Sequence, residues 1–133
     1  MIAGLGGILG FHIGADYPEY TSPLRAENVA KRFPGMPVLM IHMGGAGTPD
    51  VSESVIEAAG RNPNMYLIGS AISVDKVKQA IDVLGADRVM FGSDTPFADP
   101  SEVLLRYEEM LASYSEEVKQ KVMGLNAKRL FRL

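Results

Sequence analysis

The residues with the clearest chemical potential are two histidines and an aspartate, each placed at the end of a short apolar run. His12 and His42 are the only histidines in the chain, and a glycine lies two residues away from each of them and from Asp94. Two neutral imidazoles and a carboxylate are a suitable ligand set for a divalent metal such as Zn²⁺, with a position left open for water. Asp94 could then take a proton from that water. The alternatives are a histidine bonded to a loop carbonyl and an aspartate in a turn.

Other chemistries find less support. The sequence 44–47 (GGAG) precedes an expected helix and could cradle an anion, but it matches neither the Walker nor the dinucleotide pattern and suits tight turns. No serine lies in a Gly-x-Ser-x-Gly elbow, and the absence of cysteine excludes thiolate metal sites and cysteine nucleophiles.

The three candidate residues can form one site only if helices and strands bring them close together in space. Apolar runs at 7–13, 37–43, 65–70 and 88–93 are typical of strands buried on both faces. Between and after them, start and stop signals predict helices at 24–33, 51–59, 74–84, 100–112, 115–124 and 127–131. Strands alternating with single helices imply parallel pairing, and the ends of parallel strands meet at one edge of the sheet. An open doubly wound sheet and part of a (β/α)₈ barrel both fit.

Length and composition limit the classes of protein to which the chain can belong. The 133 residues are 47% hydrophobic and 22% charged with a net charge of −3, which fits one domain over 1–133. No apolar run approaches the roughly 20 residues of a membrane span. A pI near 5.3 without a basic stripe disfavours nucleic acid as a partner. Without a signal-peptide pattern, we expect a soluble cytoplasmic domain.

Four segments resemble, in order, the second half of an amidohydrolase-2 domain, in the branch of the amidohydrolase superfamily related to aminocarboxymuconate-semialdehyde decarboxylase. They are residues 33–45 (FPGMPVLMIHMGG), 62–67 (NPNMYL), 87–97 (DRVMFGSDTPF) and 126–131 (NAKRLF). The resemblance implies an α/β fold, the C-terminal half of a metal-dependent hydrolase (β/α)₈ TIM barrel, with the four strands as barrel strands five to eight. It also implies that His12 is the metal-binding histidine of strand five. His42 is then the strand-six histidine that ligates metal or acts on substrate, and Asp94 is the strand-eight aspartate.

The sequence departs from this family in one respect. The His-x-His pair of barrel strand one has no counterpart, so we expect the chain alone to be inactive, with weak or absent metal binding. The chain is either a fragment of a longer protein or a natural half-barrel. Residues 1–6 resemble the tail of a preceding helix, which favours truncation.

The resemblance implies a reaction on a small-molecule substrate. The leading expectation is hydrolysis of an amide, ester or lactone-like bond by metal-activated water. Non-oxidative decarboxylation of an unsaturated or aromatic carboxylic acid is the alternative within enzymes. A non-catalytic half-barrel module is the alternative outside them.

The expected half-barrel also predicts an assembly. Unpaired edges at 7–13 and 88–93, and inward apolar residues, favour a homodimer or larger oligomer. We assign Ile8, Leu39, Ile41, Leu67 and Val89, or their alternating neighbours, to the inward face. A flatter open sheet covered by the C-terminal helices is the alternative.

Overall fold

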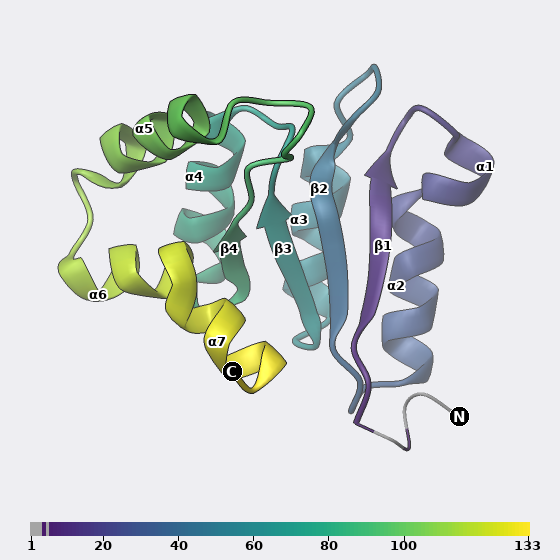
Figure 1. Ribbon diagram of the computed structural model, residues 1–133. Coiled ribbons are helices and arrows are strands. Elements are labelled where there is room, and N and C mark those ends of the chain that lie inside the picture. Colours follow the sequence, from purple (N-terminus) through teal and green to yellow (C-terminus); the bar gives the residue numbers. More distant parts are fainter. Residues whose placement is uncertain (1–3, 5) are drawn as a thin grey trace.

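The computed structural model describes residue 4 and residues 6–133, in which strands alternate with helices (Figure 1). The expected helix tail at 1–6 lies largely outside the described residues. The strands are β1 (Leu9–Gly14), β2 (Val38–Ala46), β3 (Met65–Gly69) and β4 (Val89–Phe91). The α-helices are α1 (Pro18–Thr21), α2 (Pro23–Arg32), α3 (Ser52–Arg61), α4 (Val74–Leu84), α5 (Pro100–Leu111), α6 (Glu116–Gln120) and α7 (Asn126–Phe131). The chain also contains a 3₁₀ turn (Ala86–Arg88) and a π-helical turn (Lys121–Leu125).

The four strands form one parallel sheet in the order β1-β2-β3-β4. The register places His12 beside Ile41, Ile41 beside Ile68, and Ile68 beside Met90. Side chains alternate between the two faces along each strand, so these four residues share one face. The predicted parallel βα order is confirmed, with boundaries shifted by a few residues.

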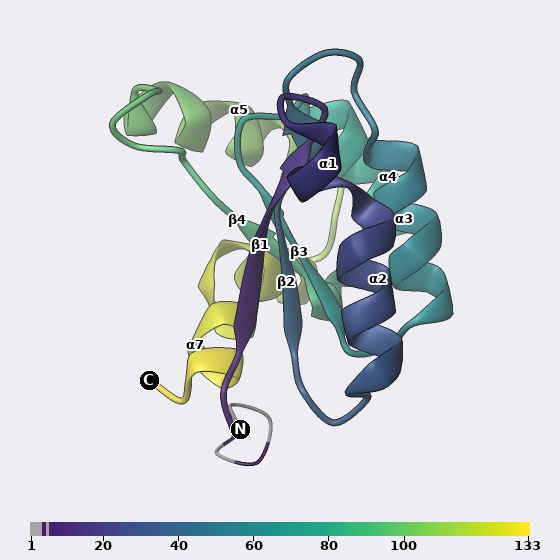
Figure 2. The ribbon, with the colours of Figure 1, turned by 90° about the vertical axis from the view of Figure 1, so that its right-hand side faces the viewer.

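One face of the sheet, which we call the back face, is covered by helices. Figure 2 shows α2, α3 and α4 together on this side. Most strand residues that point toward them are fully buried, although Leu9, Phe11 and Phe91 are only partly buried, and they form the main apolar core with the inner sides of the helices. Central members of this core are Val38, Met40, Met65, Leu67 and Val89.

The opposite face, which we call the front face, is turned toward the viewer in Figure 1. It carries Leu39, Ile41, Tyr66, Ile68 and Met90, and His12 lies on it at the β1 edge. Ile41, Tyr66 and Ile68 stay partly exposed, although Leu39 and Met90 are buried. Of the alternatives left open on β3 and β4, the structure therefore places Ile68 and Met90 on this face, and not Leu67 and Val89.

Three helices begin at a side-chain cap. The side chains of Ser73, Asp99 and Ser115 accept hydrogen bonds from the backbone N–H groups at the starts of α4, α5 and α6. Helix α3 begins slightly later than expected, where the Asp50 carboxylate accepts the N–H of Ser52 at 2.7 Å. Among the described residues, no helix combines the length and the apolar character needed to cross a membrane.

The edge of β4 is partly occupied by the C-terminal segment. The Asn126 side-chain amide donates to the carbonyl oxygens of Ala86 and Val89, at 2.6 and 2.9 Å. Asn126 is almost fully buried, and α7 packs beside β4 on the front side of the sheet (Figure 2). The expectation of a fully open edge at 88–93 is therefore wrong at Val89, because a buried asparagine satisfies its carbonyl group.

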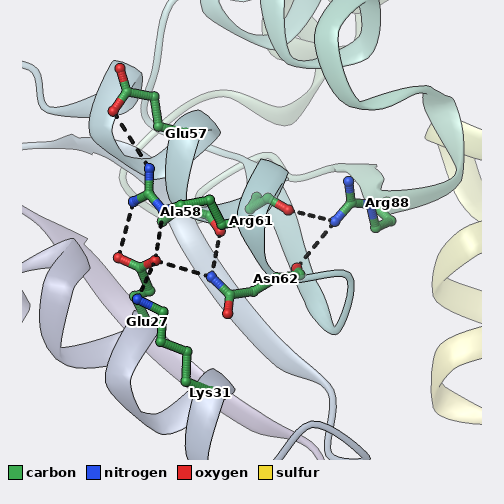
Figure 3. Close-up of polar contacts among 8 residues, drawn as sticks. Glu27, Lys31, Glu57, Ala58, Arg61, Asn62 and Arg88 are labelled. Atoms are coloured by element: carbon green, nitrogen blue, oxygen red, sulfur yellow. Dashed lines mark hydrogen bonds and ion pairs between the residues drawn. The ribbon is translucent and has the colours of Figure 1, made fainter.

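A buried carboxylate joins the back-face helices (Figure 3). Glu27 of α2 accepts hydrogen bonds from Arg61 and Asn62 at the end of α3, and it forms an ion pair with Lys31. We call these four residues the Glu27 cluster. Arg88, before β4, donates to the carbonyl oxygen of Asn62 at 3.2 Å, which ties the cluster to the segment that leads into β4.

Candidate functional site

The carboxyl ends of β1, β2 and β4 carry the three predicted site residues. His12 is the fourth residue of β1, and its side chain is half exposed. Its Nε2 lies 3.1 Å from Oδ2 of Asp16, in the loop that follows the strand. Gly14 lies between them at a point where a Cβ atom would collide with the Ala46 carbonyl of β2. The glycine therefore allows β1 and β2 to approach closely just beyond His12.

His42 lies deeper in the site than His12. Its side chain is 12% exposed, against 50% for His12, and the two rings meet edge to face with centroids 4.7 Å apart. The backbone of His42 has a φ of 69°, in the left-handed region, and Met43 follows at 51°. Such a conformation costs about 1–3 kcal/mol outside glycine and persists where the surroundings impose it. The strand end is thus shaped to place this imidazole in the site.

Ser70 is the partner of His42 that the sequence analysis did not single out. Its Oγ lies 2.8 Å from Nδ1 of His42, and its carbonyl oxygen lies 3.3 Å from the same nitrogen. Ser70 is the last residue of the expected strand 65–70, so it occupies the same place on the third strand as the three predicted residues on the others. The strand-end criterion therefore contained the signal for it.

Asp94 follows β4 and also has a left-handed backbone, with a φ of 63°. Its Oδ1 lies 3.8 Å from Nδ1 of His42, at the limit of an ion pair. Its carbonyl oxygen accepts the N–H of Phe97 at 2.8 Å, which closes the turn after the strand. The turn interpretation is therefore correct for the backbone of Asp94, while its carboxylate turns toward His42.

The structure thus gathers two His–Asp pairs, His12 with Asp16 and His42 with Asp94, which meet at the contact between the imidazole rings. This donor chemistry suits a divalent ion. Over residue 4 and residues 6–133, however, no three ligating side chains cluster closely enough to hold one. The described residues therefore supply ligands of the right type as an incomplete set.

A hollow of about 350 Å³ lies behind the same edge, between the loops after β3 and β4. Its polar lining comes from Ser73, Ser93 and Arg106, and its floor includes Tyr107. The Tyr107 hydroxyl donates to the Gly69 carbonyl, and burial raises the pKa of this tyrosine well above its usual range. A Cβ at Gly69 would collide with that hydroxyl, so the glycine permits the bond that secures the end of β3.

Comparison with known proteins gives the following matches. The sequence matches the family model described as Amidohydrolase over residues 1–133. No curated protein sequence matches significantly. Among solved structures, an uncharacterized TIM-barrel protein from Bordetella bronchiseptica is 26% identical with a TM-score of 0.78, over 98% of this chain and 47% of that one.

Two further structures are described as decarboxylases. The 5-carboxyvanillate decarboxylase from Sphingomonas paucimobilis is 24% identical with a TM-score of 0.72, over 99% of this chain and 51% of that one. A dihydroxybenzoic acid decarboxylase from Polaromonas sp. JS666 was solved with bound manganese and the inhibitor 2-nitroresorcinol. It is 19% identical with a TM-score of 0.73, over 99% of this chain and 52% of that one. The chain spans about half the length of these structures. The predicted fold class, parallel βα units of a TIM barrel, is confirmed.

Proposed function

The chain belongs to the amidohydrolase family, and we propose that it supplies one half of a divalent-metal active site that decarboxylates a small aromatic carboxylic acid. The observation that carries this proposal is the convergence of His12, His42 and Asp94 at the carboxyl edge of one parallel sheet. In barrels of this kind, that edge is where active sites are built.

The residues that would hold the ion are His12 and Asp94, with Asp16 beside the first and His42 beside the second. A bound divalent ion would supply positive charge to orient and polarise a carboxylate or carbonyl oxygen of the substrate. Because the described ligands form an incomplete set, further ligands have to come from outside this chain's four strands.

His42 and Asp94 are suited to handle the proton. Decarboxylation breaks the bond between the ring carbon and its carboxylate, releases CO₂ and places a proton on the same carbon. A general acid must therefore deliver that proton, and a histidine beside an aspartate can hold it and pass it on. His42, at 12% exposure, is sheltered enough from water to deliver the proton to the substrate.

One observation favours decarboxylation over the hydrolysis that the sequence analysis placed first. Two solved structures that this fold matches are described as decarboxylases of hydroxylated aromatic acids. Hydrolysis is the second candidate, since the Asp94 carboxylate could equally take a proton from an attacking water.

The apolar residues of the front face support the proposal that further βα units complete the barrel. Ile41, Tyr66 and Ile68 are partly exposed on a face that a closed barrel would bury, and no strand pairs with the free edge of β1 among the described residues. We propose that four further units cover this face, either from the same polypeptide or from a second copy of the chain.

The test is an assay of CO₂ release from 2,6-dihydroxybenzoate and 5-carboxyvanillate with Mn²⁺ or Zn²⁺. The chain is assayed alone and joined to a complementary four-strand half that carries a His-x-His strand. We expect activity only in the joined form, with a loss of about 10²–10⁴-fold in Asp94→Asn. Asp75→Asn, an exposed aspartate on α4, is the control. Activity that survives Asp94→Asn would contradict the proposal, and release of an alcohol or amine from ester or amide substrates would favour hydrolysis.

A further inference from the structure

Ser70 directs two polar atoms at a single nitrogen of His42. The hydroxyl oxygen lies 2.8 Å from Nδ1, and the backbone carbonyl oxygen lies 3.3 Å from it. Ser70 is 4% exposed, so these contacts are shielded from water. The chain turns sharply just afterwards, since Ala71 has a φ of 50°. The end of β3 therefore presents the serine to the imidazole of β2 at close range.

We infer that Ser70 is a positioning residue that fixes the tautomer and the orientation of the His42 ring. A carbonyl oxygen can only accept a hydrogen bond, so its contact with Nδ1 places the ring proton on that nitrogen. The Ser70 hydroxyl, at the shorter distance, then accepts from the same N–H. Nε2 keeps its lone pair, and within the described part of the chain it has no hydrogen-bonding or charged partner.

The same geometry separates the tasks of His42 and Asp94. Asp94 Oδ1 lies 3.8 Å from Nδ1, a full ångström farther than the Ser70 hydroxyl. Ser70, rather than Asp94, therefore holds the Nδ1 proton. This leaves the carboxylate of Asp94 free for an ion or a substrate proton. It also makes Nε2 the nitrogen that His42 offers to the site.

The inference rests on the proposed function only in placing His42 at the reacting centre. It is tested on the chain itself, without metal or substrate, by long-range ¹H–¹⁵N NMR of the histidine rings. His12→Ala assigns the remaining signals to His42. We expect the Nδ1–H tautomer in the wild type and in Ser70→Thr, which keeps the hydroxyl, and a shift toward the Nε2–H form in Ser70→Ala.

Ser93→Ala is the matched control, because the Ser93 hydroxyl contacts Thr95 rather than an imidazole. We expect it to leave the His42 signals unchanged. Nε2–H in the wild type would overturn the inference even if Ser70→Ala fails to fold. Nδ1–H that persists in a folded Ser70→Ala variant would overturn it as well. A negative decarboxylation assay leaves this readout unaffected, so the two proposals fail separately.

Discussion

The carboxylate of Glu27 receives two hydrogen bonds from one guanidinium group, from Nε of Arg61 at 2.9 Å and from Nη2 at 3.1 Å (Figure 3). This paired geometry is among the stronger polar contacts in proteins. Together with Lys31 and Asn62, and against the cost of burial, it lowers the pKa of Glu27 to about 2. The contact joins α2 to α3 and so fixes two successive βα units behind the site.

Replacing Glu27 by glutamine should lower the free energy of unfolding by about 3 kcal/mol. The amide keeps the volume but loses the charge that Arg61 and Lys31 face, and charge-assisted bonds of this kind contribute about 1.5–3 kcal/mol each. Glu57 also pairs with Arg61, at 3.8 Å, but it is exposed. Glu57→Gln should therefore cost no more than about 0.5 kcal/mol. Urea unfolding measures the free energy of unfolding of both variants. Equal losses of stability in Glu27→Gln and Glu57→Gln would refute the role of the buried carboxylate.

Acid should destabilise the wild type more than it does Glu27→Gln. The folded pKa of about 2 lies below the ordinary value of 4.5, so the folded state holds this proton less tightly than the unfolded state. Its contribution is fully present above pH 4.5 and is lost as the pH falls toward 2. The gap in unfolding free energy between the two proteins should narrow across this window. A gap that stays constant between pH 5 and pH 2.5 would contradict this prediction.

Asn126→Ala should destabilise the chain by about 2–3 kcal/mol. It removes the donor for the carbonyl oxygens of Ala86 and Val89, and buried acceptors without partners cost about 1–3 kcal/mol each. Gln120→Ala, which breaks one exposed contact with Glu116, is the control and should change stability by less than about 0.5 kcal/mol. Thermal unfolding followed by circular dichroism compares them, and similar melting temperatures would argue against this anchoring of β4.

The front face should drive association. Burying a few hundred Å² of apolar surface at about 25 cal/mol per Å² provides several kcal/mol. Because Asn126 and α7 occupy the β4 side, we expect contact through the front face and the β1 edge. Light scattering should give a multiple of the 14.4 kDa chain mass. Ile41→Lys should shift it toward the monomer, whereas Val83→Lys, on the exposed side of α4, should not. A wild-type mass of 14.4 kDa would rule the assembly out.

The helices and strands could be predicted from the sequence because their signals are local. The side of the sheet to which each strand side chain points could not be predicted. Caps at Ser73 and Asp99 mark helix starts directly. Residues 65–70 and 88–93, by contrast, are apolar at nearly every position, so no alternation distinguishes the back face from the front face. That is why the sequence leaves open whether Leu67 and Val89 or their neighbours point inward. Helix α1 (Pro18–Thr21) is a single turn, too short for a periodic pattern.

The candidate site could be predicted only in part. Strand ends meet at one edge, so the approach of His12, His42 and Asp94 follows from topology alone. The contact of His42 with Ser70 depends on left-handed backbone at His42 and Ala71, which is uncommon outside glycine and is not favoured by alanine. Asp16 depends on the path of the loop after β1. The contacts of Ser70 with His42 and of Asp16 with His12 therefore depend on the tertiary structure and not on a local sequence pattern.

Metal binding by His12 and Asp94 is measured by elemental analysis after dialysis against excess Zn²⁺ and then against buffer. Losing a partner of a metal ligand typically weakens binding about 10–100-fold, and losing a ligand should cost at least as much. Joined to the complementary four-strand half, the wild type and Asp75→Asn should retain the ion, and His12→Ala and Asp94→Asn should retain far less. Equal metal content in all four proteins would contradict a site built on His12 and Asp94.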